Sequence, residues 1–206
     1  MRIASHLVVT AIALSACARP QAPDVRAPEA HILDPIKAPA GVIIAHTVDT
    51  YPVTGTDRRT IGAQLHVPDG TWLERNYAGR YNWQLSWRYE TGREGTLCRV
   101  TRATVTLTST VTLPEWTDAA RADPGLVTEW TRFRRALAVH EQGHRELAYA
   151  GAGRVRRALE GIPLQPCASI AADTRITAEP ILSAMKLEQA RYDQSTRHGA
   201  TQGATF

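Results

Sequence analysis

Hydrophobic and polar positions alternate along two neighbouring stretches of the chain. Between residues 81 and 89, large aromatic or leucine side chains occupy every second position, and the residues between them are polar. From residue 98 to residue 113, valines and leucines share one side and threonines the other. A period of two is typical of a half-buried strand, and Gly92 and Gly95 mark a turn between the stretches. The pattern predicts a β-hairpin whose aromatic face belongs to the core and is not a platform for stacking a ligand.

The chain on either side of this hairpin follows other patterns. Residues 42–53 are rich in β-branched side chains and predict a strand. A helical period of 3.6 begins near Pro124 and persists to the Gly-Ile-Pro sequence at 161–163, which stops a helix. A last helix is predicted from about Ala172 to Ser195. Strands in one run and helices in another indicate an α+β fold, a small antiparallel sheet packed with a helix pair.

Individual residues predict where helices begin and where another element packs closely against a helix. We expect Thr56 to be the N-cap of a short helix and Asp173 to be the cap of the last one. Gly143, Gly151 and Gly153 lower the helix propensity of the long helix. Because glycine has no side chain, we expect another element to approach the long helix closely at these positions.

Composition and charge narrow the class of protein. The 206-residue chain is 43% hydrophobic and 21% charged, a balance typical of a folded protein. Its formal net charge is +4, and the arginines are scattered and not interleaved with aromatic residues. The sequence therefore lacks the basic footprint of a nucleic-acid-binding protein, and we expect no nucleic-acid partner.

The first residues have the features of an export signal. Arg2 precedes an apolar run that is too short to span a bilayer, and small residues follow. Leu14-Ser-Ala-Cys17 looks like a bacterial lipobox, which implies cleavage before Cys17 and acylation of its thiol. The alternative is ordinary cleavage after Ala18. We expect residues 1–16 to be a lipoprotein signal peptide, so that the protein is exported to the periplasm or cell envelope and anchored to a membrane by lipid.

The segment that follows the signal is predicted to be a tether. Residues 17–41 contain five prolines and no helix-forming run. Such a segment cannot bury apolar surface and should be extended and partly stiff. The folded domain is therefore expected to occupy residues 42–206.

Two further cysteines lie within this domain. Cys98 and Cys167 are the only thiols besides Cys17, and in an exported protein such a pair most simply forms a disulfide. Two buried free thiols are less favoured. A metal site that uses them is the least favoured, because neither cysteine lies near a CxxC or a histidine pair.

The motif that carries chemistry lies inside the predicted long helix. The sequence from His140 to His144 reads His-Glu-Gln-Gly-His. Two histidines at this spacing lie on one helix face, so both imidazoles can bind one metal ion. Glu141 lies beside them, where a carboxylate can accept a proton from water. Leu137 and Leu147 share the stripe of the histidines, which indicates a buried face and argues against a solvated one.

A catalytic zinc also needs a third protein ligand and an open position. The metzincin pattern requires Gly and His at the positions that Leu147 and Ala150 occupy, so that class is excluded. The last helix is the natural source of the third ligand. Its candidates are Glu179, Glu188, Asp193 and His198. Glu188 would give a gluzincin-like site, whereas His198 lies in a segment that can turn inward before a glycine.

Several separated motifs of the domain match a known bacterial pattern. They are Tyr51-Pro-Val-Thr-Gly55, Trp83 to Tyr89, Cys98, Leu113-Pro-Glu-Trp116, Leu137-Ala-Val-His-Glu-Gln-Gly-His144 and Tyr192-Asp-Gln-Ser-Thr-Arg-His-Gly199. Through them, residues 42–203 resemble a family catalogued as a domain of unknown function and described as predicted secreted zinc-dependent proteases. The resemblance implies a zincin-like helix pair and makes His198 the favoured third ligand. Asp193 is then free to orient an imidazole and Tyr192 to stabilise an oxyanion, unless either is a core or capping residue.

These features together predict a zinc-dependent metallopeptidase that hydrolyses a peptide or protein substrate. Zinc is the expected cofactor, and Glu141 is the expected general base. One alternative is a binding or assembly module of the envelope with a structural or inactive metal site, which four protein ligands would close. Another is an amidase that acts on cell-wall peptides, which would share the mechanism and differ only in substrate.

Overall fold

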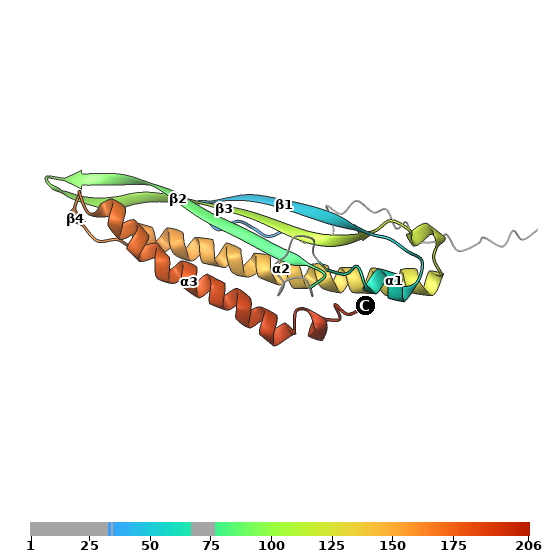
Figure 1. Ribbon diagram of the computed structural model, residues 1–206. Coiled ribbons are helices and arrows are strands. Elements are labelled where there is room, and N and C mark those ends of the chain that lie inside the picture. The colour runs from blue at the N-terminus through green and yellow to red at the C-terminus, as the bar shows by residue number, and fades with distance from the viewer. Residues whose placement is uncertain (1–32, 34, 67–76) are drawn as a thin grey trace, which may run out of the picture.

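A computed structural model describes residues 33, 35–66 and 77–206, and it shows an elongated molecule of two layers (Figure 1). A sheet forms one layer, and two long helices, α2 and α3, form the other. The elements in chain order are β1 (Val42–Val53), α1 (Arg58–Gly62), β2 (Arg80–Glu94), β3 (Leu97–Trp116), η3 (Ala119–Arg121), α2 (Pro124–Glu160), β4 (Gln165–Pro166), α3 (Ile170–Thr196) and η4 (Ala200–Gln202). The α+β prediction is confirmed.

The sheet has the strand order β1-β3-β2, and β4 pairs with the beginning of β3. β2 and β3 form the predicted antiparallel hairpin, with Gly95 at a positive φ of 64° in its turn. β1, however, runs parallel to β3. The sheet is therefore mixed, and the expectation of a wholly antiparallel sheet is corrected in this respect. Two strands joined by a connection as long as residues 54–79 need not pair with each other, and here β3 lies between β1 and β2.

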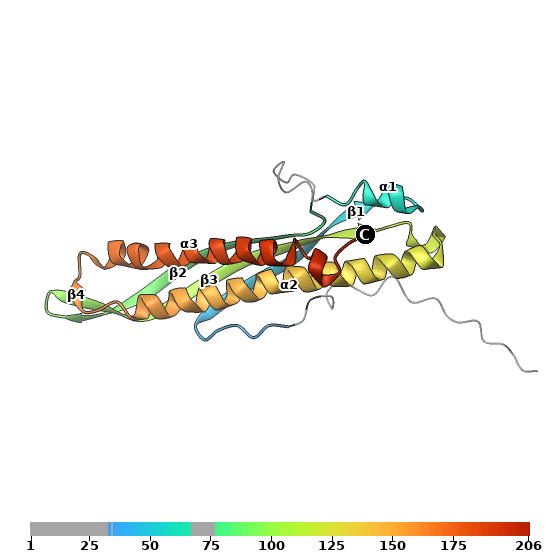
Figure 2. The same cartoon turned by 90° about the horizontal axis from the view of Figure 1, so that it is seen from below.

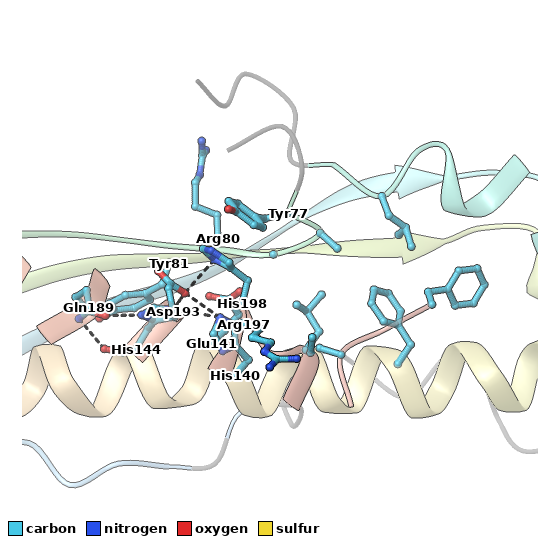
Figure 3. A pocket seen from close by; sticks show the side chains of 18 of the residues that line it. Tyr77, Arg80, Tyr81, His140, Glu141, His144, Gln189, Asp193, Arg197 and His198 are labelled. Carbon is cyan, nitrogen blue, oxygen red and sulfur yellow. Dashed lines mark hydrogen bonds and ion pairs between the residues drawn. The ribbon is translucent and has the colours of Figure 1, made fainter. Parts of the chain in front are cut away.

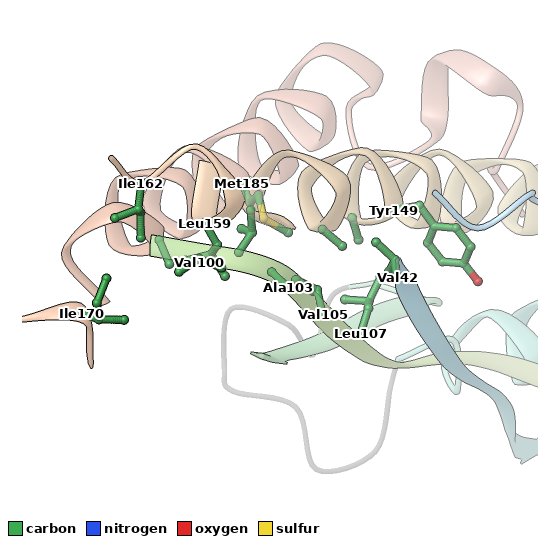
Figure 4. Close-up of a cluster of buried hydrophobic side chains, with 14 of the residues drawn as sticks. Val42, Val100, Ala103, Val105, Leu107, Tyr149, Leu159, Ile162, Ile170 and Met185 are labelled. Carbon is green, nitrogen blue, oxygen red and sulfur yellow. The ribbon is translucent and has the colours of Figure 1, made fainter. Parts of the chain in front are cut away.

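The alternation along β3 decides which face of the sheet the helices cover. Val105, Leu107, Val111 and Leu113 are completely buried, while the threonines between them are more exposed. The aromatic residues of β2 are half-buried and pack mainly against a cluster that includes Met185 of α3. Figure 4 shows this cluster between the sheet and the helices. The aromatic face of the hairpin is thus a core face, as the sequence predicted.

α2 and α3 lie side by side beneath the sheet (Figure 2), and glycines permit their close approach. A Cβ atom on Gly143 would overlap the phenol oxygen of Tyr192, and one on Gly151 would lie 2.5 Å from Sδ of Met185. These two contacts confirm the expectation that glycines of the long helix are closely approached. They also fix how far α3 is shifted along α2, and hence which α3 residues face the histidines.

The helix caps differ from the expectations. Asp57 is the N-cap of α1, because its carboxylate accepts from the backbone N–H of Thr60 at 3.0 Å, whereas Thr56 lies outside the helix. α3 begins after Ser169, and Asp173 lies in the first turn and not at the cap. A carboxylate in the first turn still stabilises a helix through the helix dipole, which explains the sequence signal at Asp173.

The predicted disulfide is confirmed. Cys98 and Cys167 are bonded, with their Cα atoms 4.7 Å apart. The bond ties the end of the hairpin to the connection between α2 and α3, beside the short ladder of β3 and β4. It lies at the end of the molecule that carries the hairpin turn (Figure 1).

The predicted signal peptide at 1–16 and the predicted lipidation site Cys17 lie outside the described residues. Of the predicted tether at 17–41, the last part is described. There Ile36 packs against the core cluster, and Pro39 lies against Gly153 of α2, again a closely approached glycine. In the described part of the chain, the helices are too short or too polar to cross a membrane.

Candidate metal centre

α2 and α3 bring together three side chains of the kinds that bind metals, at one point beneath β2 (Figure 3). His140 and His144 lie on successive turns of α2, and Asp193 faces them from α3. The Nε2 atoms of His140 and His144 are 3.3 Å apart. Asp193 Oδ1 lies 3.2 Å from His140 Nε2 and 2.9 Å from His144 Nε2. We call these three atoms the triangle. In a tetrahedral site with zinc bonds of about 2.1 Å, ligand atoms are about 3.4 Å apart. The sides of the triangle, 2.9–3.3 Å, are slightly shorter than this spacing, so the three atoms are close enough together to hold one metal ion.

Two glutamines hold the outer nitrogens of the imidazoles. His144 Nδ1 lies 2.5 Å from Oε1 of Gln189, whose Nε2 donates to the backbone carbonyl of His144 at 3.0 Å. His140 Nδ1 lies 3.1 Å from Oε1 of Gln202, whose Nε2 donates to the hydroxyl of Tyr192 at 3.1 Å. Because each amide oxygen can only accept, each Nδ1 donates, so a neutral imidazole has its lone pair on Nε2, inside the triangle. A protonated imidazole carries a second N–H there, which Asp193 Oδ1 accepts.

The triangle is also suited to a cation by charge. Burial opposes ionisation of Asp193, but its hydrogen bonds with His140 and His144 hold its pKa well below the usual value. Burial acts to lower the pKa of His144, yet the hydrogen bond with Asp193 and the charge of Glu141 raise it overall. A carboxylate thus stays ionised beside two imidazole nitrogens, and a bound cation would satisfy all three groups.

Glu141 lies next to the triangle and is almost completely buried. Its Oε2 has no hydrogen-bond partner among the described residues. Gly79, just before β2, covers its other oxygen so closely that a Cβ atom there would overlap Oε1. Burial raises the pKa of Glu141 to about 7, against the opposing effect of the charges of His144 and His140. The side chain is therefore placed to accept a proton from a molecule bound in the triangle.

His198 lies at the rim of the site. Arg197 and His198 both have positive φ, 50° and 51°, a left-handed conformation that costs non-glycine residues about 1 kcal/mol or more each. This turn brings His198 Nδ1 to 3.4 Å from Asp193 Oδ1, and its ring stacks on Tyr77 with centroids 3.8 Å apart. The predicted role of His198 as third ligand stays a prediction. Asp193 is one of the three side chains that could hold a metal ion, and its expected role in orienting an imidazole stays a prediction.

The other candidates lie elsewhere. Glu188 forms an ion pair with Arg154 at 2.5 Å, and Glu179 is exposed on α3. The ring of Tyr192 stacks on His140 with centroids 5.2 Å apart and meets His144 edge-on at 4.9 Å. Its hydroxyl contacts Gln202 on the outer side of these rings. Tyr192 thus supports both imidazoles, and its predicted oxyanion role stays a prediction.

The functional residues that the sequence analysis missed are the two glutamines. Gln189 precedes Asp193 by one helical turn, so a search of that face of α3 could have found it. Gln202 lies in η4, beyond the end of the last predicted helix, and no sequence pattern points to it. Its position depends on the left-handed turn after α3.

A cavity of about 520 Å³ opens beside the triangle (Figure 3). It is lined by the beginning of β2, by α2, by the end of α3 and by the residues that follow α3. Arg80, Arg197 and Tyr77 contribute polar groups to its wall, and Glu141 lies at its base. The triangle is therefore accessible to a molecule larger than water.

The model of one protein family, described as bacterial protein of unknown function (DUF922), matches residues 48–199. The matched range includes the triangle, Glu141 and His198. No curated protein and no solved structure matches this chain.

Proposed function

The chain belongs to DUF922, a bacterial family of unknown function, and we propose that it is a zinc-dependent metallopeptidase of the cell envelope. The observation that carries the proposal is the triangle of His140 Nε2, His144 Nε2 and Asp193 Oδ1, with sides of 2.9–3.3 Å, beside buried Glu141. Two imidazoles and one carboxylate are a donor set of catalytic zinc sites, which keep a fourth position open for water or substrate.

Each residue then has a defined task in hydrolysis. When bound, zinc would polarise a substrate carbonyl and make water nucleophilic near neutral pH. Glu141 accepts the proton of the attacking water at Oε2 and then delivers it to the leaving amine. Gln189 and Gln202 keep both Nε2 lone pairs directed inward. His140, Glu141 and His144 are each almost completely buried, and this low exposure strengthens their electrostatic interactions.

We assign the third protein ligand to Asp193, because its Oδ1 lies within 3.2 Å of both imidazole nitrogens. His198 is the alternative that the family resemblance favours, and it lies next to Asp193. If His198 also bound the ion, four protein ligands would close the site. That arrangement would be structural, as expected of a binding or assembly module.

The export of the protein is part of the proposal. The disulfide between Cys98 and Cys167 is a bond that persists in oxidising compartments. The signal sequence and the lipobox ending at Cys17 support lipid anchoring in the envelope. The substrate is a peptide or protein, and an amidase that cleaves cell-wall peptides would use the same residues.

The proposal is tested by measuring zinc content and peptide hydrolysis together. The wild-type protein should retain about one zinc per chain, and His140→Ala and His144→Ala should lose it. Glu141→Gln should keep the zinc and lose roughly 10²- to 10⁴-fold in hydrolysis, because the amide cannot accept the proton. Retention of both metal and hydrolysis in the two histidine variants would refute the proposal.

The same measurement separates the ligand assignments. Asp193→Ala should strip the zinc, whereas His198→Ala should retain it. The reverse result would make His198 the third ligand. X-ray absorption spectroscopy of the zinc-loaded protein adds a second criterion, because four protein ligands without water would favour the structural alternative.

A further inference from the structure

The cavity beside the metal centre has two chemically different ends. At one end, Arg80, Asn82 and Gln189 line it from β2 and α3. At the other end, it meets a second cluster of buried hydrophobic residues, which includes Val53 and Trp130. We name this end the apolar lobe. Its lining residues are Gly62, Leu65, Phe133, Leu137, Ala204 and Phe206.

The apolar lobe is continuous with the catalytic part of the cavity. Leu137 precedes Glu141 by one turn of α2, and Gly79 lies over both side chains. Phe133 lies one turn before Leu137 in α2, farther from Glu141. At about 1.5 Å per residue, the lobe therefore extends along α2 for about 12 Å from Glu141. Phe133 and Leu137 are almost completely buried and form its floor.

The segment after α3 forms the far wall of the lobe. It turns at Gly199, whose φ is 82°, and Ala204 N donates to Gly199 O at 3.0 Å. Phe206 then packs against Phe133 and Trp130, with ring centroids 5.4 Å and 5.5 Å apart. Because these rings hold the segment in place, Ala204 and Phe206 set the depth of the lobe.

We propose that the apolar lobe is a specificity pocket for the large apolar side chain of a substrate residue that flanks the cleaved peptide bond. This inference rests on the proposed metallopeptidase function and adds the substrate class to it. A lobe lined by aliphatic and aromatic carbon stabilises an apolar side chain by removing it from water, and it disfavours a charged one. Leucine and phenylalanine are therefore preferred over glycine, by roughly ten- to hundred-fold.

Binding of small hydroxamates to the zinc-loaded protein tests this inference without requiring turnover. N-acetyl derivatives of glycine, leucine and phenylalanine hydroxamate differ only in the side chain, and calorimetry gives the affinity of each. The phenylalanine compound should bind at least about ten-fold more tightly than the glycine compound. Ala204→Leu fills the lobe and should reduce this ratio. Phe206→Ala should move the preference toward the larger naphthylalanine compound.

A matched variant serves as the control for Ala204→Leu. Ala190→Leu places the same side chain on an exposed position of α3 and should keep the wild-type ratio. Equal affinities for all compounds, or a ratio unchanged by Ala204→Leu, would overturn the specificity pocket and leave the metal centre intact.

If no hydroxamate binds, the metallopeptidase proposal fails. Nuclear magnetic resonance of the metal-free protein then tests whether the apolar lobe binds an apolar side chain. A shift of the Ala204 methyl signal on titration with N-acetylphenylalanine amide supports the apolar pocket. The absence of such a shift overturns it.

Discussion

At the scale of single residues, the geometry of the candidate metal centre depends on side chains outside the triangle. Each buried imidazole is held by one glutamine oxygen, and the glutamine nitrogen is itself held by another group. This arrangement fixes the ring orientation and the tautomer before any ion binds. The motif residues His140, Glu141 and His144 were predictable from their spacing. Gln189 could have been found on the Asp193 face of the last helix, whereas Gln202 could not, because its contact depends on how η4 docks on α2.

The first prediction concerns Gln202. Gln202→Ala should raise the dissociation constant for zinc by about 10- to 100-fold, because His140 Nδ1 loses its shorter contact and keeps only Thr196 Oγ1 at 3.4 Å. Gln202→Glu keeps an acceptor and should retain tight binding. Gln194→Ala, at an exposed position of α3, is the control. A competitive titration with a chromophoric chelator measures all three constants. Equal constants for wild type and Gln202→Ala would show that the contact is dispensable.

The second prediction concerns His46, whose Nδ1 lies 3.0 Å from the hydroxyl of Ser109. Burial lowers the pKa of His46 to about 4, helped by the charge of Arg145. In the unfolded chain His46 has its ordinary pKa near 6.5. Below that pH the unfolded chain therefore binds a proton that the folded chain does not, and stability falls as the pH falls.

His46→Gln removes this titration while keeping a hydrogen-bonding group. Between pH 7 and pH 5, the wild type should lose about 1 kcal/mol more free energy of unfolding than the variant, after allowance for the half-exposed position. Urea denaturation at both pH values measures this difference. An equal loss in both proteins would contradict the low pKa of His46.

At the scale of elements, the contact of α2 and α3 decides which residues meet. The helical period and the helix-stopping residues predicted the bounds of both helices closely. They did not predict how far one helix is shifted along the other, because no local sequence pattern encodes this register. The register is set where glycines of α2 receive Tyr192 and Met185 of α3. One helical turn of slippage would move Asp193 by about 5 Å and take it out of the triangle. The sequence could therefore provide the list of candidate ligands but not the choice among them.

The third prediction tests this contact. Gly151→Ala should destabilise the protein by about 1–3 kcal/mol, because the added methyl group would lie 2.5 Å from Sδ of Met185. Helix propensity alone would favour alanine by about 1 kcal/mol. The matched control is Gly62→Ala in α1, where no atom lies within 4 Å of the added Cβ, and it should be neutral or stabilising. Thermal denaturation followed by circular dichroism compares the two. Stabilisation by Gly151→Ala would refute the close contact.

At the scale of the whole molecule, connections that are distant in sequence decide the architecture. Alternating residues predicted the hairpin of β2 and β3, because its turn is local. The parallel pairing of β1 with β3 was not predictable from local patterns, because both the hydrophobic faces and the strand lengths suit either direction. The disulfide is the other long-range link, and it was predictable only because the domain contains no further cysteines.

The last prediction tests whether the disulfide at one end of the molecule affects the candidate metal centre. The disulfide closes a loop over a sequence separation of 69 residues, so Cys98→Ala combined with Cys167→Ala should cost about 2–4 kcal/mol of stability. The bond lies at the hairpin end, whereas the triangle lies where α2 and the end of α3 meet (Figure 1). The double variant should therefore melt at a lower temperature yet keep about one zinc per chain at 25 °C. Hydrogen exchange should increase first around β4 and the hairpin turn. If zinc is lost while the protein is still folded, the two ends are coupled and the metal centre depends on the disulfide.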